Sequence, residues 1–177
     1  MKINKEYKNI VNSILNNENF VLLKNDTHHG TSKYDHCKRV SYLSYLIAKL
    51  FKANTSESAR AGLLHDFFYG GRMLKEENSY FKHPITSAKN AEKCFGIANN
   101  EKEIIETHMY HYAYFKKLTL IMSSEEKEYL ENYKPKNKES KIVCIADLLV
   151  SIYEVITYKL KYSCALYMLF LINIIRY

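Results

Sequence analysis

The sequence predicts an all-α fold for a chain of 177 residues, and three observations support this prediction. The 5 glycines and 2 prolines are too few for an architecture of many strands and turns. Apolar residues recur at steps of three and four, as Val40, Leu43 and Ile47 do, which places them on one face of a helix. Pairs that start helices, such as Ser32 with Asp35, precede these segments.

Three helices are expected in the N-terminal half of the chain, over about residues 4–16, 32–54 and 56–68. A polar loop at 24–31 separates the first two, and adjacent glycines at 70–71 stop the third. His36 shares the apolar face of the second helix and therefore points inward. His65 and Asp66 fall near the end of the third helix, so both side chains can reach a common point.

Four further helices are expected in the C-terminal half, over about residues 85–95, 99–112, 123–134 and from 138 onward. Pro84 suits the first turn of the first of these, so His83 lies at a helix start. The uncharged run at 163–175 is shorter than the ~18 residues that a membrane span usually needs. Residues 156–177 are therefore expected to form an apolar helix that is buried or makes a subunit contact, with a membrane-associated tail as the alternative.

The composition limits the classes of partner. The net charge of +7 raises the question of a nucleic-acid partner, but only four basic residues are arginines and no Lys/Arg stripe follows one helix face. We therefore expect no stable nucleic-acid complex; the lysines instead favour a polyanionic small-molecule substrate. The four cysteines form no CxxC pair, and the N-terminus is too polar for a secretory signal, which indicates a cytoplasmic protein.

The residues most suggestive of chemistry are histidines and aspartates in a fixed order. His36, His65, Asp66 and Asp147 come from segments that can lie side by side, and together they make a ligand set for Fe, Mn, Co, Ni or Zn. Asp147 lies in an otherwise apolar stretch, where a carboxylate is costly unless it is paired or bound to metal. A hydrogen-bonded core aspartate is the alternative interpretation for this residue.

Other histidines lie between these ligands in the sequence. His83 and His108 are sufficient to complete a second metal site, although His83 could instead cap a helix and His108 could be a hydrogen-bonded core histidine. His111 follows His108 by one helical turn and is a candidate proton donor or reserve ligand. His28 and His29 lie in the expected loop, where solvation is the simpler interpretation.

The stretch Lys33-Tyr-Asp-His36, the run Ala61-Gly-Leu-Leu-His65-Asp66 and the distant Ala146-Asp147-Leu148 resemble the HD-domain superfamily of metal-dependent phosphohydrolases. The resemblance covers about residues 28–155 of a single domain, 1–177, and implies a compact helical bundle. It also implies that His36, His65, Asp66 and Asp147 bind one metal ion. His83 and His108 match the histidines of the binuclear branches, in which the aspartate matching Asp66 bridges two ions. These branches include cyclic-dinucleotide phosphodiesterases and hydrolases of symmetrical diadenosine tetraphosphate.

The resemblance implies cleavage of a phosphate ester or anhydride of a small metabolite, a nucleotide or dinucleotide, by a metal-activated hydroxide. Asp66 and His111 are then the catalytic candidates, and the expected phosphate holders are Lys33, Arg39, Arg72 and Lys75. Candidates for stacking on a base are Tyr69, Tyr110 and Tyr114, although most of the 16 tyrosines must be packing residues. The Gly-Tyr-Pro signature of one cyclic-dinucleotide branch is missing. A regulatory protein that binds metal or nucleotide with little turnover is the alternative.

Overall fold

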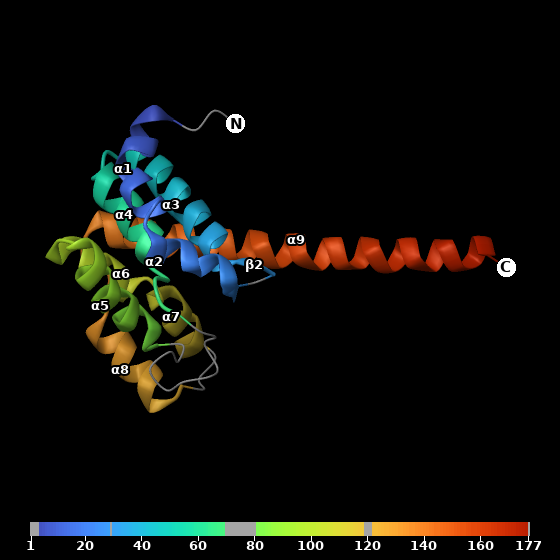
Figure 1. Cartoon of the computed structure of the whole chain (residues 1–177). Helices are drawn as coiled ribbons and strands as arrows, with labels where there is room; N and C mark the ends of the chain where they lie inside the picture. The colour runs from blue at the N-terminus through green and yellow to red at the C-terminus, as the bar shows by residue number, and fades with distance from the viewer. Residues whose placement is uncertain (1–3, 29, 70–80, 119–121, 177) are drawn as a thin grey trace.

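The computed structural model describes residues 4–28, 30–69, 81–118 and 122–176, and most of this part of the chain is helical (Figure 1). They are α1 (Lys5–Leu15), α2 (Glu18–Val21), the 3₁₀ helix η1 (Leu22–Asn25), α3 (Lys33–Leu50), α4 (Thr55–Leu64), α5 (His83–Phe95), α6 (Asn99–Thr107), α7 (Tyr110–Leu118), α8 (Ser124–Asn132) and α9 (Lys138–Arg176). Two short strands, β1 (Thr27–His28) and β2 (Thr31–Ser32), pair as an antiparallel hairpin within the expected polar loop. The prediction of an all-α fold is confirmed.

Helix α9 holds the two halves of the body together. In Figure 1, α1, α3 and α4 lie on one side of it, and α5 to α8 lie on the other. Helix α9 packs against α3 and α4 as well as α6 and α7. The main hydrophobic core forms where these helices meet, and its fully buried members include Val40, Leu63, Ile104 and Val143. Side chains projected from these helices toward α9 can therefore meet at the centre of the molecule.

Two helix starts follow the expected capping chemistry. The Ser32 hydroxyl oxygen accepts a hydrogen bond of 3.1 Å from the backbone N–H of Asp35 at the start of α3. At α8 the Ser123 hydroxyl accepts from the Glu126 N–H, and the Glu126 carboxylate accepts in return from the Ser123 N–H. These bonds satisfy backbone donors that a helix start leaves unpaired, so the local sequence determines where both helices begin.

Helix α3 ends at Leu50, a few residues before the expected position, and two further helices end early at a histidine. Helix α4 ends at Leu64, so His65 and Asp66 occupy a turn after it, and α6 ends at Thr107 instead of continuing to residue 112. At each of these two ends, the residue that follows the helix is a histidine whose ring forms a hydrogen bond with the backbone carbonyl three residues earlier. Nδ1 of His65 lies 2.9 Å from the oxygen of Gly62, and His108 repeats the arrangement with its own α6 carbonyl. A side chain that satisfies a last-turn carbonyl favours the end of the helix there.

The C-terminal part of α9 leaves the body of the molecule (Figure 1). The helix contains 39 residues, which corresponds to about 58 Å at 1.5 Å per residue. Between Glu154 and Met168, several large apolar side chains are exposed, among them Ile156, Leu160 and Leu166. None of the helices in the described ranges combines the length and the apolar character needed to cross a bilayer. A subunit contact through this exposed segment stays a prediction.

A close approach of α3 and α4 gives the first testable prediction. A methyl group at Gly62 would lie 3.0 Å from the Ser44 hydroxyl oxygen and 3.2 Å from the Cα of Ser41. Because the second contact is to backbone, α3 and α4 would have to move apart. We expect Gly62→Ala to lower the free energy of unfolding by about 1–3 kcal/mol, the usual cost of overpacking. Denaturant titration measures this change. Lys8→Ala, at an exposed site of α1, is the control, and equal stability of the two variants would contradict the prediction.

Candidate metal centre

Six side chains of ligand type converge at the centre of the molecule. They come from α3, the turn after α4, the start of α5, the turn between α6 and α7, and α9. All are buried, with at most 6% of any residue exposed. They are His36, His65, Asp66, His83, His108 and Asp147. The structure thus brings together all six residues that the sequence suggested as metal ligands.

The first group of donors is formed by His36, His65 and Asp147. Nε2 of His36 lies 3.2 Å from Nε2 of His65, and Oδ1 of Asp147 lies 3.2 Å and 3.6 Å from these two nitrogens, respectively. Imidazole nitrogen and carboxylate oxygen are the donors that divalent transition metals prefer. Three buried donors in mutual contact therefore form a suitable site for one such ion.

The second group of donors is formed around the other side of Asp66. Its Oδ1 lies 3.2 Å from Nε2 of His83 and 3.7 Å from Nε2 of His108, and these two nitrogens are 3.1 Å apart. The other oxygen, Oδ2, lies 3.9 Å from Nε2 of His65 in the first group. The two oxygens of one carboxylate therefore face the two groups, an arrangement that suits a ligand shared between two ions.

Hydrogen bonds on the opposite side of each ring fix the orientation of three of the histidines. Nδ1 of His65 and Nδ1 of His108 each face a backbone carbonyl, and Nδ1 of His36 lies 2.9 Å from Oε2 of Glu154. An oxygen acceptor at Nδ1 requires a proton there, which leaves the lone pair on Nε2 in a neutral ring. When these rings are neutral, the Nε2 atoms that point into the cluster therefore carry the lone pair that a metal ion needs.

The electrostatics of the first group favour a positive charge at its centre. Burial lowers the pKa of His36, but hydrogen bonds to Asp147 and Glu154 outweigh burial and raise it. Burial also opposes the charged form of His65, yet Asp66 and Asp147 hold its pKa well above the ordinary value. Burial would raise the pKa of Asp147, but the hydrogen bonds from His36 and His65 hold it well below its usual range. Without metal, protons supply the positive charge that an ion would otherwise bring.

The second group behaves differently because it is surrounded by other imidazoles. Burial, together with repulsion from the nearby His65 and His83, lowers the pKa of His108 well below its ordinary value. Burial likewise lowers the pKa of His111. Both rings are therefore neutral near pH 7, and a neutral imidazole retains the lone pair that a metal ion or a proton requires.

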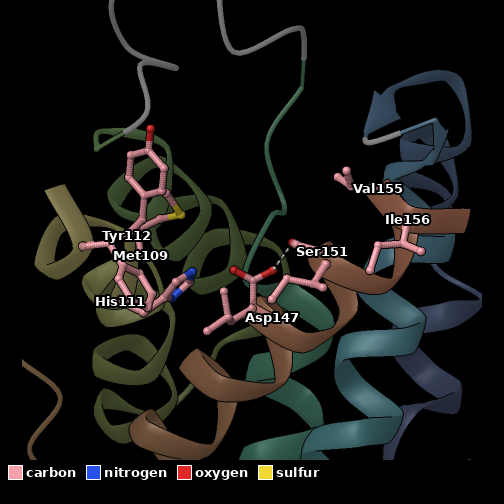
Figure 2. A pocket seen from close by; sticks show the side chains of 10 residues that line it. Met109, His111, Tyr112, Asp147, Ser151, Val155 and Ile156 are labelled. Atoms are coloured by element: carbon pink, nitrogen blue, oxygen red, sulfur yellow. Dashed lines mark hydrogen bonds between the residues drawn. The ribbon is translucent and has the colours of Figure 1, made fainter. Parts of the chain in front are cut away.

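A cavity of about 310 Å³ opens beside Asp147, between α7 and α9 (Figure 2). Figure 2 shows the imidazole of His111 and the carboxylate of Asp147 on facing sides of this space, with Ser151 next to the aspartate. The remaining lining is apolar or aromatic: Met109, Tyr112, Phe115, Leu148, Ile152, Val155 and Ile156. The cavity thus has a polar end, at the cluster of histidines and aspartates, while the rest of its lining is apolar or aromatic.

The expected phosphate holders lie in different places. Lys33 is buried; its Nζ lies 2.8 Å from the carbonyl oxygen of Phe68 and 3.1 Å from the carboxylate of Asp26. The Arg39 guanidinium contacts Glu154 at 2.7 Å. Neither side chain lines the cavity beside Asp147. The other two, Arg72 and Lys75, lie outside the described residues, as do Gly70 and Gly71.

The three tyrosines suggested for base stacking are also dispersed. The Tyr69 hydroxyl donates to the carbonyl oxygen of Asn19, at the surface. Tyr110 and Tyr114 stack on each other along α7 with ring centroids 6.4 Å apart. The aromatic residues that do line the cavity, Tyr112 and Phe115, lie between and beside them on the same helix. Tyr112 and Phe115, and not Tyr110 and Tyr114, are therefore the aromatic residues of α7 that line the cavity.

Two residues near the centre received no role from the sequence. Glu154 is buried against His36, and the thiol of Cys144 lies 3.0 Å from the carbonyl oxygen of His108 and 3.6 Å from Nδ1 of His111. Glu154 follows Asp147 by seven residues, which is two helical turns on the same face, so its position was visible in the pattern. The Cys144 contact has no comparable signal, because it depends on the break between α6 and α7.

Comparison with known proteins gives one match. The family model for the HD domain matches residues 34–151, which include all six clustered residues. Neither the curated proteins nor the solved structures contain a match to the chain.

Proposed function

The chain belongs to the HD-domain family, and from this premise we propose that it is a metal-dependent phosphohydrolase acting on a phosphate ester or anhydride of a small metabolite. One observation carries the proposal: one oxygen of the buried Asp66 carboxylate lies against Nε2 of His83 and His108, and the other faces Nε2 of His65. A carboxylate placed in this way can serve as a ligand shared between two ions.

We propose that the centre holds two divalent transition-metal ions chosen from Fe, Mn, Co, Ni and Zn. His36, His65 and Asp147 would hold one ion, His83 and His108 the other, and Asp66 would contact both. Such ions lower the pKa of bound water and neutralise charge on phosphoryl oxygens. The six side chains are buried, so the packing around them would restrict their movement when an ion enters.

His111 is the proposed proton-transfer residue. Its Nδ1 lies 3.0 Å from the carbonyl oxygen of His108, which makes that nitrogen the donor and leaves Nε2 free to accept a proton. The ring lines the cavity across from Asp147 (Figure 2). The lowered pKa keeps the imidazole neutral near pH 7, so it would take a proton first and return it to the leaving oxygen afterwards.

We further propose that the cavity binds the base of a nucleotide or dinucleotide. Among the described residues that line it none is a lysine or arginine, so this space suits an uncharged, apolar group and not a phosphate. Tyr112 and Phe115 on α7 face Ile152 and Ile156 on α9, which offers a flat aromatic ring one aromatic wall and one aliphatic wall. The phosphate would then point toward Asp147 and the metal cluster.

Hydrolysis assays test the proposal. Inorganic phosphate is measured for nucleoside monophosphates and for glycerol phosphate, a compound without a base, and the nucleotide products are measured for a dinucleotide polyphosphate. We expect hydrolysis by the Mn²⁺- or Co²⁺-loaded protein, none by the chelated protein, and a higher kcat/KM for the nucleotides. Phe115→Ala should lower kcat/KM for nucleotides about tenfold, since stacking on a base contributes ~1–3 kcal/mol, and should leave glycerol phosphate unaffected.

Leu118→Ala, an exposed α7 site outside the cavity lining, is the matched control and should change neither substrate. Nucleotide binding without turnover in every metal form would favour the regulatory alternative. Equal rates for nucleotides and glycerol phosphate would contradict the assignment of the cavity while leaving the metal centre in place.

A further inference from the structure

Glu154 is a carboxylate buried deep in the protein, and the proposed reaction assigns it no role. Only 3% of the residue is exposed. One oxygen, Oε2, lies 2.9 Å from Nδ1 of His36, and the other, Oε1, lies 2.7 Å from the Arg39 guanidinium. A buried carboxylate is expensive unless both oxygens are paired, and here both are.

Two carboxylates of helix α9 therefore contact the imidazole of His36, one at each ring nitrogen. Asp147 lies 3.2 Å from Nε2 of His36, and Glu154, two turns further along the same face, lies against Nδ1. The ring is held between two carboxylates of a single rigid helix. A shift of α9 along its axis would therefore move both of these contacts together.

His36 differs in this respect from two other histidines of the cluster. His65 and His108 donate from Nδ1 to neutral backbone carbonyls, whereas His36 donates to a carboxylate. A charge-assisted hydrogen bond is shorter and stronger than a neutral one, and it makes the opposite nitrogen a better donor to a metal ion. The difference in partner predicts that His36 is the most strongly oriented of these three imidazoles.

Arg39 completes the chain of contacts. It lies on α3, one turn after His36, and its Nη1 also donates to the Thr31 hydroxyl at 3.2 Å. Its positive charge offsets the negative charge of Glu154, which would otherwise add to those of Asp66 and Asp147 in the same core. Arg39 thus gives Glu154 a partner of opposite charge beside the cluster.

We propose that Glu154 is a positioning residue of the metal centre: it holds His36 with Nδ1 protonated and Nε2 directed at the ion, and Arg39 anchors Glu154 from the surface. The proposal rests on the metal centre described under Proposed function. The alternative is that the Arg39–Glu154 ion pair only stabilises the packing of α3 against α9. In that case, replacing Glu154 would change the stability of the protein but not its affinity for metal.

Titration with Co²⁺ in competition with a chelator separates these readings, because the visible spectrum of bound Co²⁺ reports its ligands directly. Glu154→Gln keeps the shape of the side chain but removes its charge. We expect Co²⁺ affinity to fall about 10–100-fold, the usual effect of losing the partner of a metal-bound histidine, with an altered spectrum. The melting temperature of the metal-free protein serves as the second readout and should fall little.

Glu6→Gln is the matched control, since Glu6 also pairs with a cation of α3, Lys49, but far from the cluster. It should leave Co²⁺ affinity unchanged. Unchanged affinity and spectrum in Glu154→Gln, or a loss of stability without a loss of affinity, would overturn the proposal. Wild-type protein that binds no Co²⁺ would instead overturn the metal centre itself.

A second variant keeps the proposal testable if Glu154→Gln folds poorly. Arg39→Gln leaves Glu154 and His36 in place and removes only the surface anchor, where 43% of the Arg39 side chain is exposed. We expect a loss of Co²⁺ affinity smaller than that caused by Glu154→Gln. Wild-type affinity in a folded Arg39→Gln protein would overturn the anchoring role of Arg39.

Discussion

Replacing Asp66 with alanine is expected to remove hydrolysis and most of the bound metal while leaving the helical fold intact. The carboxylate contacts His83 through one oxygen and faces His65 through the other, so its loss opens both proposed ion sites at once. Metal ions contribute several kcal/mol of transition-state stabilisation, which corresponds to a loss of about a thousandfold or more in kcat. No other single substitution in the cluster should have so large an effect.

Three measurements test this expectation: elemental analysis for metal per chain, phosphate release for turnover, and circular dichroism for helix content. Asp66→Asn is the matched variant, because it keeps the shape and removes the charge; we expect reduced metal content with the same fold. Glu92→Ala, which removes an exposed carboxylate paired with Lys102, controls for a general loss of negative charge. Full activity in Asp66→Ala would contradict the proposed mechanism.

The residues of the candidate metal centre that could be predicted from the sequence are those whose pattern lies within a single helix. His36 was placed inward by its spacing with Val40 and Leu43, and Asp147 was identified by its apolar surroundings. Both signals depend on one helix alone, and the structure buries both side chains. The all-α fold followed from the same kind of local pattern.

Signals that depend on competition between side chain and backbone were missed. The apolar periodicity continues through His65 and His108, so helices were expected to extend past both residues. In the structure the ring of each histidine donates a hydrogen bond to a backbone carbonyl in the last turn of the preceding helix, and the helix ends there. This ending turns Nε2 toward the cluster, so the same bond that shortens the helix also positions the ligand.

Contacts between residues far apart in the chain are the other feature that local patterns did not reveal. Lys33, three residues before His36, is expected to hold phosphate; in the structure it lies in the interior against Asp26 and the Phe68 carbonyl. Arg39 pairs with Glu154, a residue 115 positions away in the chain. Spacing on one helix cannot predict such partners, because they depend on how α3 packs against α9.

Removing the metal ions is expected to lower the stability of the whole protein. Six buried donors converge within the core, and without ions their charges must be satisfied by protons and by one another. A ligand at 100 to 1,000 times its Kd stabilises the folded state by about 2.7–4.1 kcal/mol, which for a domain of this size corresponds to roughly 5–15 °C in melting temperature.

Thermal melts of the Mn²⁺-loaded and chelator-treated protein measure this difference, and adding Mn²⁺ back should restore it. Asp66→Ala supplies the control, since a variant that has lost its sites should show a much smaller shift with the chelator. An equal melting temperature for loaded and chelated wild-type protein would mean that the cluster is satisfied internally. The buried histidines and aspartates would then be a hydrogen-bonded polar core, and the ligand interpretation of Asp147 would give way to the structural one that the sequence left open.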